Sequence, residues 1–353
     1  IEGSNMRYVR SSSNDEGGPV VWDFSIRAQY DLGDIVGWVK EALPELRAAL
    51  DAHGAVLLKG LCGIAAEDHV GAVFTALGQG MDDYVGGSSP RTRLGPRVFT
   101  ATDLPGTYSV ALHQEMAYLP IYPAVLAFYC ATPANEGGAT TLASARTITK
   151  RIDSDVLKRF DEGGVNITRV LPPDGSIHLA SGVSKSWQAV FATRDPSVAV
   201  AACARRGWDC DWLSNGALRV HHGHLPAMRV HARTGERLWF NQAHYFAPAC
   251  MEQWAREDAR ATNLLRISRA LRASPEMLNS VRHADGNLVA DEDVRHIWDV
   301  LRASELEIRW QAGDLLILDN VLCLHGRRPF TGQRMLYAGL FAHLGTDETD
   351  KVA

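Results

Sequence analysis

The stretch of residues 313–340 reads GDLLILDNVLCLHGRRPFTGQRMLYAGL, and its pattern predicts two buried β-strands joined by a turn. The first strand is the apolar run LLILD, RPFTG supplies the turn, and MLYAGL begins the second strand. His325 follows the first strand, and Arg334 stands nine residues later on the second. A buried, unpaired arginine is costly, so an arginine in an apolar strand predicts a carboxylate partner. That partner is either an ordinary internal aspartate or a bound carboxylate, and the nearby His325 favours the bound ligand.

His113 and Glu115 form an HxE pattern inside another strand-like run, YSVALHQEMAY (108–118). Alternate residues of a strand point to the same face, so the imidazole and the carboxylate would converge while Gln114 faces away. Two histidines and one carboxylate with open positions are the ligand set of non-haem iron(II) oxygenases. An HxE pair alone is a weak indicator, but a third ligand from the distant His325 strand predicts a metal site.

The remaining pattern predicts one domain that is mainly β with added α. Helical spacing covers the ranges 34–53, 66–77, 145–160, 196–206, 251–273 and 291–303. Strand signals cover 55–60, 124–131, 139–144, 217–222, 226–232, 237–244, 305–310, 314–320 and 335–343. Early strands, a helical insert over roughly 145–305 and late strands predict one β-barrel or sandwich, built from both ends of the chain.

The ends and the loops carry further expectations. Residues 1–5 (IEGSN) resemble the remnant of an expression tag, which leaves 6–353 as the single domain. Residues 80–107 are rich in Gly, Ser, Pro and Arg and predict a loop. Its arginines Arg91, Arg93 and Arg97 could bind a substrate carboxylate, but the sequence slightly favours a solvated basic loop.

Composition excludes several classes of protein. Apolar residues make up 46% of the chain and charged residues 22%, which is typical of a globular protein and not of a disordered one. The net charge of −5 gives no general attraction to nucleic acid or to an anionic membrane. The 6 cysteines contain no CxxC pair, and no apolar run is long enough to span a bilayer. We therefore expect a cytoplasmic protein with free thiols and neither nucleic-acid nor membrane partners.

Four segments together resemble the TauD/TfdA superfamily of 2-oxoglutarate dioxygenases, in particular its SyrP-like and clavaminate-synthase-like branches. The segments are HQEMAY (113–118), EGGATTLAS (136–144), WFNQAH (239–244) and LDNVLCLHGRRPFTGQR (318–334). The resemblance implies a double-stranded β-helix (jelly roll) with a helical insert and flanking helices. It also implies Fe(II), 2-oxoglutarate and O2 as cofactor and co-substrates.

The resemblance assigns roles to individual residues. His113, Glu115 and His325 match the iron ligands, and Arg334 matches the arginine that holds the distal carboxylate of 2-oxoglutarate. Thr140 matches a threonine that contacts the co-substrate; Thr141 is a competitor, and strand alternation allows only one of them to face the site. Glutamate at position 115 argues against a halogenase, because relatives that chlorinate carry a small residue there. Three further residues, Tyr118, Asn241 and Arg327, are candidates for substrate contact. Tyr118 and Arg327 are equally well explained by packing or an ion pair, and the sequence leaves open whether Asn241 faces the pocket.

The resemblance implies hydroxylation of an amino acid or an amino-acid-derived unit in natural-product biosynthesis, with 2-oxoglutarate converted to succinate and CO2. The substrate would be a small molecule, free or tethered to a carrier protein. Desaturation, epoxidation or cyclisation by the same oxidising centre is the alternative. A zinc-dependent or cupin-like hydrolase or isomerase is the alternative of another class, and it would need the metal ligands but not Thr140 or Arg334.

Overall fold

The computed structural model describes residues 6–11, 17–25, 30–64, 66–81, 91–176, 185–257, 264–266, 269 and 275–345. The expected tag remnant, residues 1–5, lies outside these ranges. Within them, no helix is both long and apolar enough to cross a membrane.

The largest sheet has nine strands, and its centre is built from both ends of the chain, as predicted. Its order is β1-β2-β3-β18-β8-β21-β6-β5, with β4 also paired to β21. These strands are β1 Val9–Ser11, β2 Val20–Asp23, β3 Ala55–Lys59, β4 Gly78–Gly80, β5 Arg93–Gly95, β6 Val98–Thr100, β8 Val125–Thr132, β18 Leu315–Asp319 and β21 Met335–Leu344. Strand β18 is buried at every position, which explains its uninterrupted apolar sequence.

A second sheet of four strands packs on one face of the first. Its order is β17-β10-β19-β7, with bounds Leu306–Ile308, Thr140–Ser144, Cys323–Arg327 and Val110–His113. Apolar side chains from both sheets share one core cluster, which includes Leu57, Phe128, Leu316, Leu318 and Leu340 from the large sheet and Leu142, Ile308 and Cys323 from the small one. Each such side chain stabilises the fold by about 1.5–3 kcal/mol when fully buried.

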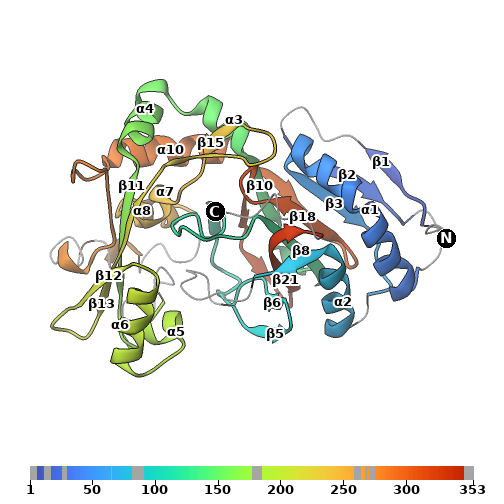
Figure 1. Ribbon diagram of the computed structural model, residues 1–353, viewed down its shortest axis with the longest axis horizontal. Coiled ribbons are helices and arrows are strands. Elements are labelled where there is room, and N and C mark those ends of the chain that lie inside the picture. The colour runs from blue at the N-terminus through green and yellow to red at the C-terminus, as the bar shows by residue number, and fades with distance from the viewer. Residues whose placement is uncertain are drawn as a thin grey trace.

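Helices α1 (Leu32–His53) and α2 (Glu67–Leu77) cover the other face of the large sheet (Figure 1). Helix α1 begins at an Asp31 capping box and ends at Gly54, whose φ of 76° gives the left-handed cap that glycine favours. Ile317 faces this helical layer while its neighbours in β18 face the second sheet. Strand β18 is therefore the shared wall of two cores.

The insert stands at the opposite side of the molecule from α1 and α2 (Figure 1). It contains a four-stranded sheet, in the order β12-β13-β11-β16, with bounds Asp209–Trp212, Leu218–Leu225, Val165–Leu171 and Ser280–Arg282. Two short pairs complete the strands: β14 Met228–Val230 with β15 Arg237–Trp239, and β9 Glu136–Gly137 with β20 Phe330–Thr331. The helical elements are α3 Ala145–Arg151, α4 Ser154–Gly163, α5 Trp187–Phe191, α6 Pro196–Arg205, α7 Ala243–Phe246, α8 Cys250–Trp254, η2 Pro275–Met277 and α10 Asp291–Ala303. One core cluster joins the helices and the four-stranded sheet of the insert to Leu112 of β7 and Leu324 of β19.

The structure corrects the expected layout at four places. The insert is not simply helical, because the unexpected strand β11 runs through its centre. The helix expected over 145–160 is interrupted after α3, and the strand expected over 237–244 stops at Trp239 before α7 begins. Two strands, β5 and β6, lie within the expected loop 80–107, while residues 82–90 of that loop are outside the described ranges. Much of the helix expected over 251–273 is also outside them; α8 covers its first residues.

Candidate active site

His113 and Glu115 lie in a strand end and the turn that follows it. Strand β7 stops at His113, and Met116 adopts a φ of 57°, a conformation that residues with side chains rarely take. The prediction that both residues share one face of a continuous strand is therefore wrong in this detail. The turn nevertheless brings the two side chains together, with Nε2 of His113 3.9 Å from Oε2 of Glu115.

His325 completes the cluster from the neighbouring strand β19, where it is the register partner of His113. Its Nε2 is 3.9 Å from Oε2 of Glu115, and the two imidazole rings are 4.4 Å apart between centroids. Potential ligand atoms of these three residues all lie within 4.8 Å of one another, and all three residues are buried. A single ion fits between them, since metal bonds to nitrogen and oxygen are about 2.0–2.2 Å long.

The protonation of the cluster also suits a metal. Nδ1 of His113 lies 2.9 Å from the carbonyl oxygen of Ala111, which accepts its proton and leaves Nε2 as the ligand atom. Burial, followed by the neighbouring His113, lowers the pKa of His325 well below its ordinary value, so this imidazole is neutral. Burial alone would raise the pKa of Glu115, but the charge of Arg91 and the neighbouring His113 hold it below its usual range. The site therefore offers two imidazole nitrogens and one carboxylate.

Asn320, in the turn between β18 and β19, fixes the backbone of the acidic ligand. Its Oδ1 accepts from the Glu115 N–H at 2.7 Å, and its Nδ2 donates to the Glu115 carbonyl at 2.9 Å and to the Pro123 carbonyl at 2.8 Å. The Gln242 side chain donates in turn to the carbonyl of Gln114. Asn320 has no exposed surface, so none of these groups can exchange its partner for bulk water.

Replacing Asn320 by leucine is expected to weaken Fe(II) binding by about 10–100-fold and to lower the free energy of unfolding by about 2–4 kcal/mol. The variant leaves three buried backbone groups without their partner and frees the turn that carries Glu115. Asn241→Leu is the matched control, because Asn241 is equally buried and its side chain bonds the backbone of Ala227 and Ala243 instead. Denaturant unfolding and anaerobic calorimetric titration with Fe(II) should show similar stability losses but a weakened metal affinity only for Asn320→Leu; equal affinities would contradict a positioning role.

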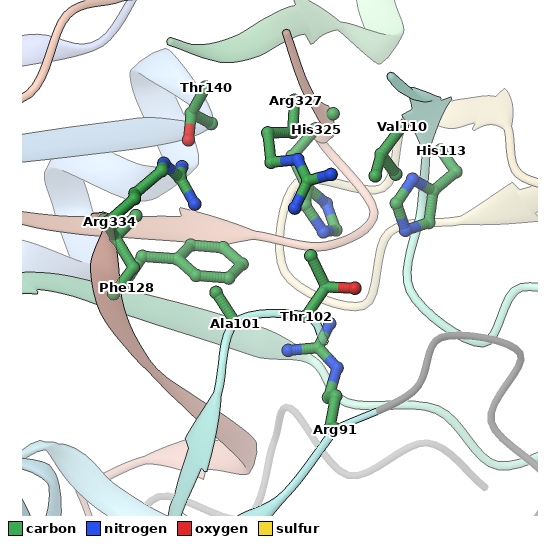
Figure 2. Close-up of a pocket in the computed structure, with 12 residues that line it drawn as sticks. Arg91, Ala101, Thr102, Val110, His113, Phe128, Thr140, His325, Arg327 and Arg334 are labelled. Atoms are coloured by element: carbon green, nitrogen blue, oxygen red, sulfur yellow. The ribbon is translucent and has the colours of Figure 1, made fainter. Parts of the chain in front are cut away.

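A pocket extends from the metal ligands to Arg334 (Figure 2). Figure 2 shows Arg334 and Thr140 at one end, His113 at the other, and His325 between them. The pocket also receives Phe128 and Leu336 from the large sheet, so it opens between the two sheets.

Arg334 is a partly buried cation whose only hydrogen bond, among the described residues, runs from Nε to the Gly138 carbonyl at 3.1 Å. Burial lowers the pKa of Arg334 to about 10. Within the described ranges no carboxylate lies at ion-pair distance from it, so the ordinary internal Arg–Asp pair is not found there. The guanidinium faces the pocket with donors to spare, next to Thr140 (Figure 2).

Thr140, and not Thr141, faces this pocket. Nε1 of Trp310 donates to Oγ1 of Thr140 at 2.9 Å, which leaves the threonine O–H able to donate into the pocket. Thr141 is paired with Gly326, where an added Cβ would come within 2.6 Å of its Oγ1. Strand alternation thus resolves the choice between the two threonines.

The three residues expected near substrate occupy different positions. Arg327 lines the pocket, but its guanidinium donates to the carbonyls of Leu104, Pro105 and Tyr108 and so holds that loop. Asn241 is fully buried, bonds only backbone groups among the described residues, and does not line the pocket. Tyr118 is also fully buried, and its ring packs on Phe246 at 4.9 Å.

Arg91 belongs to the site, whereas the sequence slightly favoured a solvated position for it. Its side chain is only 3% exposed and donates to Oε2 of Glu115 at 2.5 Å, so it does not belong to a solvated basic loop. The guanidinium lies across the pocket from Thr140 and Arg334 (Figure 2). Its polar, glycine-rich neighbourhood gave no local signal of burial.

Comparisons with known proteins agree with this geometry. The model of the family described as "Taurine catabolism dioxygenase TauD, TfdA family" matches residues 18–340. The dapdiamide synthesis protein DdaC of Enterobacter agglomerans is 31% identical over 295 residues, which cover 82% of this chain and 83% of DdaC. A clavaminate synthase-like protein of Arabidopsis thaliana is 29% identical over 298 residues, covering 84% and 83% of the two chains.

The fold is shared with solved structures as well. PvcB, described as an Fe, alpha-ketoglutarate dependent oxygenase from an isonitrile synthetic pathway, superposes with a TM-score of 0.50 at 17% identity, covering 97% of this chain and 94% of PvcB. The family match over most of the chain and the buried His–Glu–His cluster confirm the resemblance read from the four sequence segments. The chain belongs to the TauD/TfdA family and is an Fe(II)- and 2-oxoglutarate-dependent dioxygenase whose metal ligands are His113, Glu115 and His325.

Proposed function

We propose that this dioxygenase hydroxylates an amino acid or an amino-acid-derived substrate in natural-product biosynthesis, as 2-oxoglutarate is converted to succinate and CO2. The bound Fe(II), with 2-oxoglutarate and O2, supplies an oxidant able to attack an unactivated carbon. The chain would hold the ion with His113, Glu115 and His325 and would provide a pocket for the keto acid. Support for natural-product chemistry comes from the similarity to DdaC, which is named for dapdiamide synthesis.

The observation that carries the co-substrate assignment is the pocket that runs from the metal ligands to the partly buried Arg334. In this proposal Arg334 and Thr140 would bind the distal carboxylate of 2-oxoglutarate, which would place its keto-acid end beside His113 and His325. A guanidinium suits this role because it offers two parallel N–H donors to a planar carboxylate. We further propose that the two facing sheets form a double-stranded β-helix and that residues 6–353 make a single cytoplasmic domain.

A zinc-dependent or cupin-like hydrolase is the second candidate, and it is less well supported. Such an enzyme would use the three metal ligands but would have no need for a buried cation and a hydroxyl donor at the far end of the pocket. Desaturation, epoxidation and cyclisation use the same site residues and differ only in the product.

The test is an assay of the purified protein with Fe(II), ascorbate, O2 and 2-oxoglutarate. We expect succinate to form, and a weak visible charge-transfer band to develop when Fe(II) and 2-oxoglutarate are combined without oxygen. A substrate screen read by mass spectrometry should then show the gain of one oxygen, whereas the loss of two hydrogens would indicate desaturation or cyclisation. Full turnover of a substrate with Zn(II) and no keto acid would overturn the proposal. The screen should include amino acids loaded on a carrier protein as well as free ones.

A further inference from the structure

The end of strand β7, which carries the metal ligand His113, is contacted by side chains at the start of the short helix α7 in the insert. The His244 ring nitrogen Nε2 lies 2.8 Å from the carbonyl oxygen of Leu112, the residue before the ligand. The Gln242 side chain donates to the carbonyl of Gln114, the residue after it. One segment of the insert therefore bonds to the backbone on both sides of the ligand.

These two contacts are made along the outer edge of strand β7. The strand stands at the end of its sheet, and within the described ranges it pairs only with β19. Carbonyls two residues apart point to the same side of an extended chain, so Leu112 and Gln114 present theirs together. Buried carbonyls on an edge without a further strand need donors from elsewhere in the chain. His244 and Gln242 are those donors.

The partner of His244 determines which of its ring nitrogens carries the proton. A carbonyl oxygen only accepts hydrogen bonds, so Nε2 is protonated and donates to Leu112. Burial lowers the pKa of His244 to about 4, so the ring is neutral at physiological pH and has this one proton to donate. His244 has no exposed surface and Gln242 is 1% exposed, so bulk water cannot replace either donor.

Helix α7 is held in turn by the neighbouring helices α8 and α10 of the insert (Figure 1). Nε1 of Trp298 in α10 donates to the His244 carbonyl at 3.0 Å. The ring of Tyr245 packs on Trp254 of α8 at 4.8 Å between centroids, and on the other side it lies 5.8 Å from the His113 ring. The ligand strand is therefore attached to the packed helices of the insert as well as to its own sheet.

Two metal ligands that are neighbours in sequence thus have separate supports. Glu115 is held through Asn320, in the turn between β18 and β19, whereas the contacts around His113 come from the insert. We propose that Gln242 and His244 are positioning residues for His113. They hold the backbone on both sides of this ligand, so that its imidazole points at the same ion as the other two ligands. The inference concerns metal binding alone and holds for any substrate.

The test measures Fe(II) binding by the full chain without oxygen or substrate, beside its melting temperature. His244→Phe keeps a buried ring but removes the donor, and we expect the affinity for Fe(II) to fall by about 10–100-fold. At saturating Fe(II), the charge-transfer band formed with 2-oxoglutarate should shift, because one ligand is misplaced. His244→Gln keeps an N–H donor and should recover most of the lost affinity; an equal loss in both variants would overturn the role of the donor.

His343→Phe is the matched control. His343 lies on β21 in the large sheet, is 2% exposed, and has its Nε2 3.1 Å from Oε1 of Gln79. The control makes the same substitution at an imidazole that is buried like His244, and it should lower the melting temperature while leaving the affinity for Fe(II) unchanged. If His244→Phe behaves as this control does, or if both variants lose the same Fe(II) affinity, the proposal is overturned.

Gln242→Met tests the second contact, also where His244→Phe fails to fold. Methionine has nearly the same shape as glutamine but no donor, and we expect the affinity for Fe(II) to fall by about tenfold. An unchanged affinity in this variant would remove Gln242 from the set of positioning residues. Because no substrate takes part in these measurements, their outcome does not depend on which compound the enzyme oxidises.

Discussion

Glu115→Ala is expected to lower succinate formation by about 10³-fold or more, because it removes the only anionic ligand of the metal. The two remaining imidazoles leave the ion weakly held in a buried site. The variant also deprives the buried Arg91 of the carboxylate that it contacts at 2.5 Å. Removing one partner of a buried pair costs about 3–5 kcal/mol, so the melting temperature should fall even without metal.

Two further variants separate charge from shape at this position. Glu115→Gln keeps the size but loses the charge, and we expect it to be nearly as inactive as the alanine variant. Glu115→Asp keeps the charge on a side chain shorter by one methylene, and we expect it to retain about 1–10% of turnover, since the ligand is misplaced by roughly 1 Å.

The control is Glu236→Ala, which breaks a different ion pair, with Arg146 at 2.5 Å, and neither of these residues lines the pocket. It should lose stability but keep its iron and its turnover. Iron content and the charge-transfer band should be measured beside succinate. An alanine variant at position 115 that keeps both iron and full turnover would disprove the assignment of the ligand.

The helices and strands best predicted from the sequence are those whose apolar residues follow directly from which of their faces are buried. Helix α10 shows a one-sided apolar stripe, and β18 shows an unbroken apolar run because it is covered on both faces. Strand β11 was missed because its sequence, VNITRVL, places a buried arginine where the apolar alternation should continue.

The metal site was predicted correctly, but the structure shows a different reason for the convergence of its ligands. His113 and Glu115 converge because the chain turns at Met116, not because a strand continues through them. No propensity of the HQE segment encodes that turn; it is held from outside by Asn320, which lies far along the chain.

Residues whose role depends on tertiary burial could not be recognised locally. Arg91 sits among glycines, serines and prolines, and only the folded chain brings it onto Glu115. Asn320 looks like an ordinary turn residue in LDN, and its three hydrogen bonds are to groups remote in sequence. Arg334 was singled out because an arginine next to the apolar run of β21 departs from the pattern around it.

Arg334→Leu is expected to raise the concentration of 2-oxoglutarate needed for half-maximal turnover by about 10²-fold or more. Two charge-assisted hydrogen bonds, each worth about 1.5–3 kcal/mol, are lost, and every 1.4 kcal/mol corresponds to tenfold in affinity. Arg334→Lys keeps a charge without the planar pair of donors. We expect it to raise the concentration of 2-oxoglutarate needed for half-maximal turnover by roughly tenfold. Arg328→Leu is the control, since the neighbouring Arg328 pairs on the outside with Glu305 and Glu307 and should leave the 2-oxoglutarate requirement unchanged.

Keto-acid selectivity provides a second and sharper measurement of the same variant. Pyruvate and 2-oxobutyrate lack the distal carboxylate, so the unmodified protein should discriminate strongly against them, because they leave the guanidinium buried without an anion. Arg334→Leu should lose most of this discrimination, and a variant that still prefers 2-oxoglutarate by the same factor would show that the carboxylate is held elsewhere.

Stability should change in the opposite direction to affinity. Burial lowers the pKa of Arg334 to about 10, below its value in the unfolded chain, so holding the cation in the folded state destabilises the protein at every pH below about 10. The cost declines as the pH rises through that folded-state value toward the unfolded one. Arg334→Leu removes it, and the free energy of unfolding at neutral pH without co-substrate should rise by roughly 1–3 kcal/mol. Saturating 2-oxoglutarate should then raise the melting temperature of the unmodified, metal-loaded protein much more than that of the variant. A buried arginine kept for structure would give the reverse result: a less stable variant whose response to 2-oxoglutarate is unchanged.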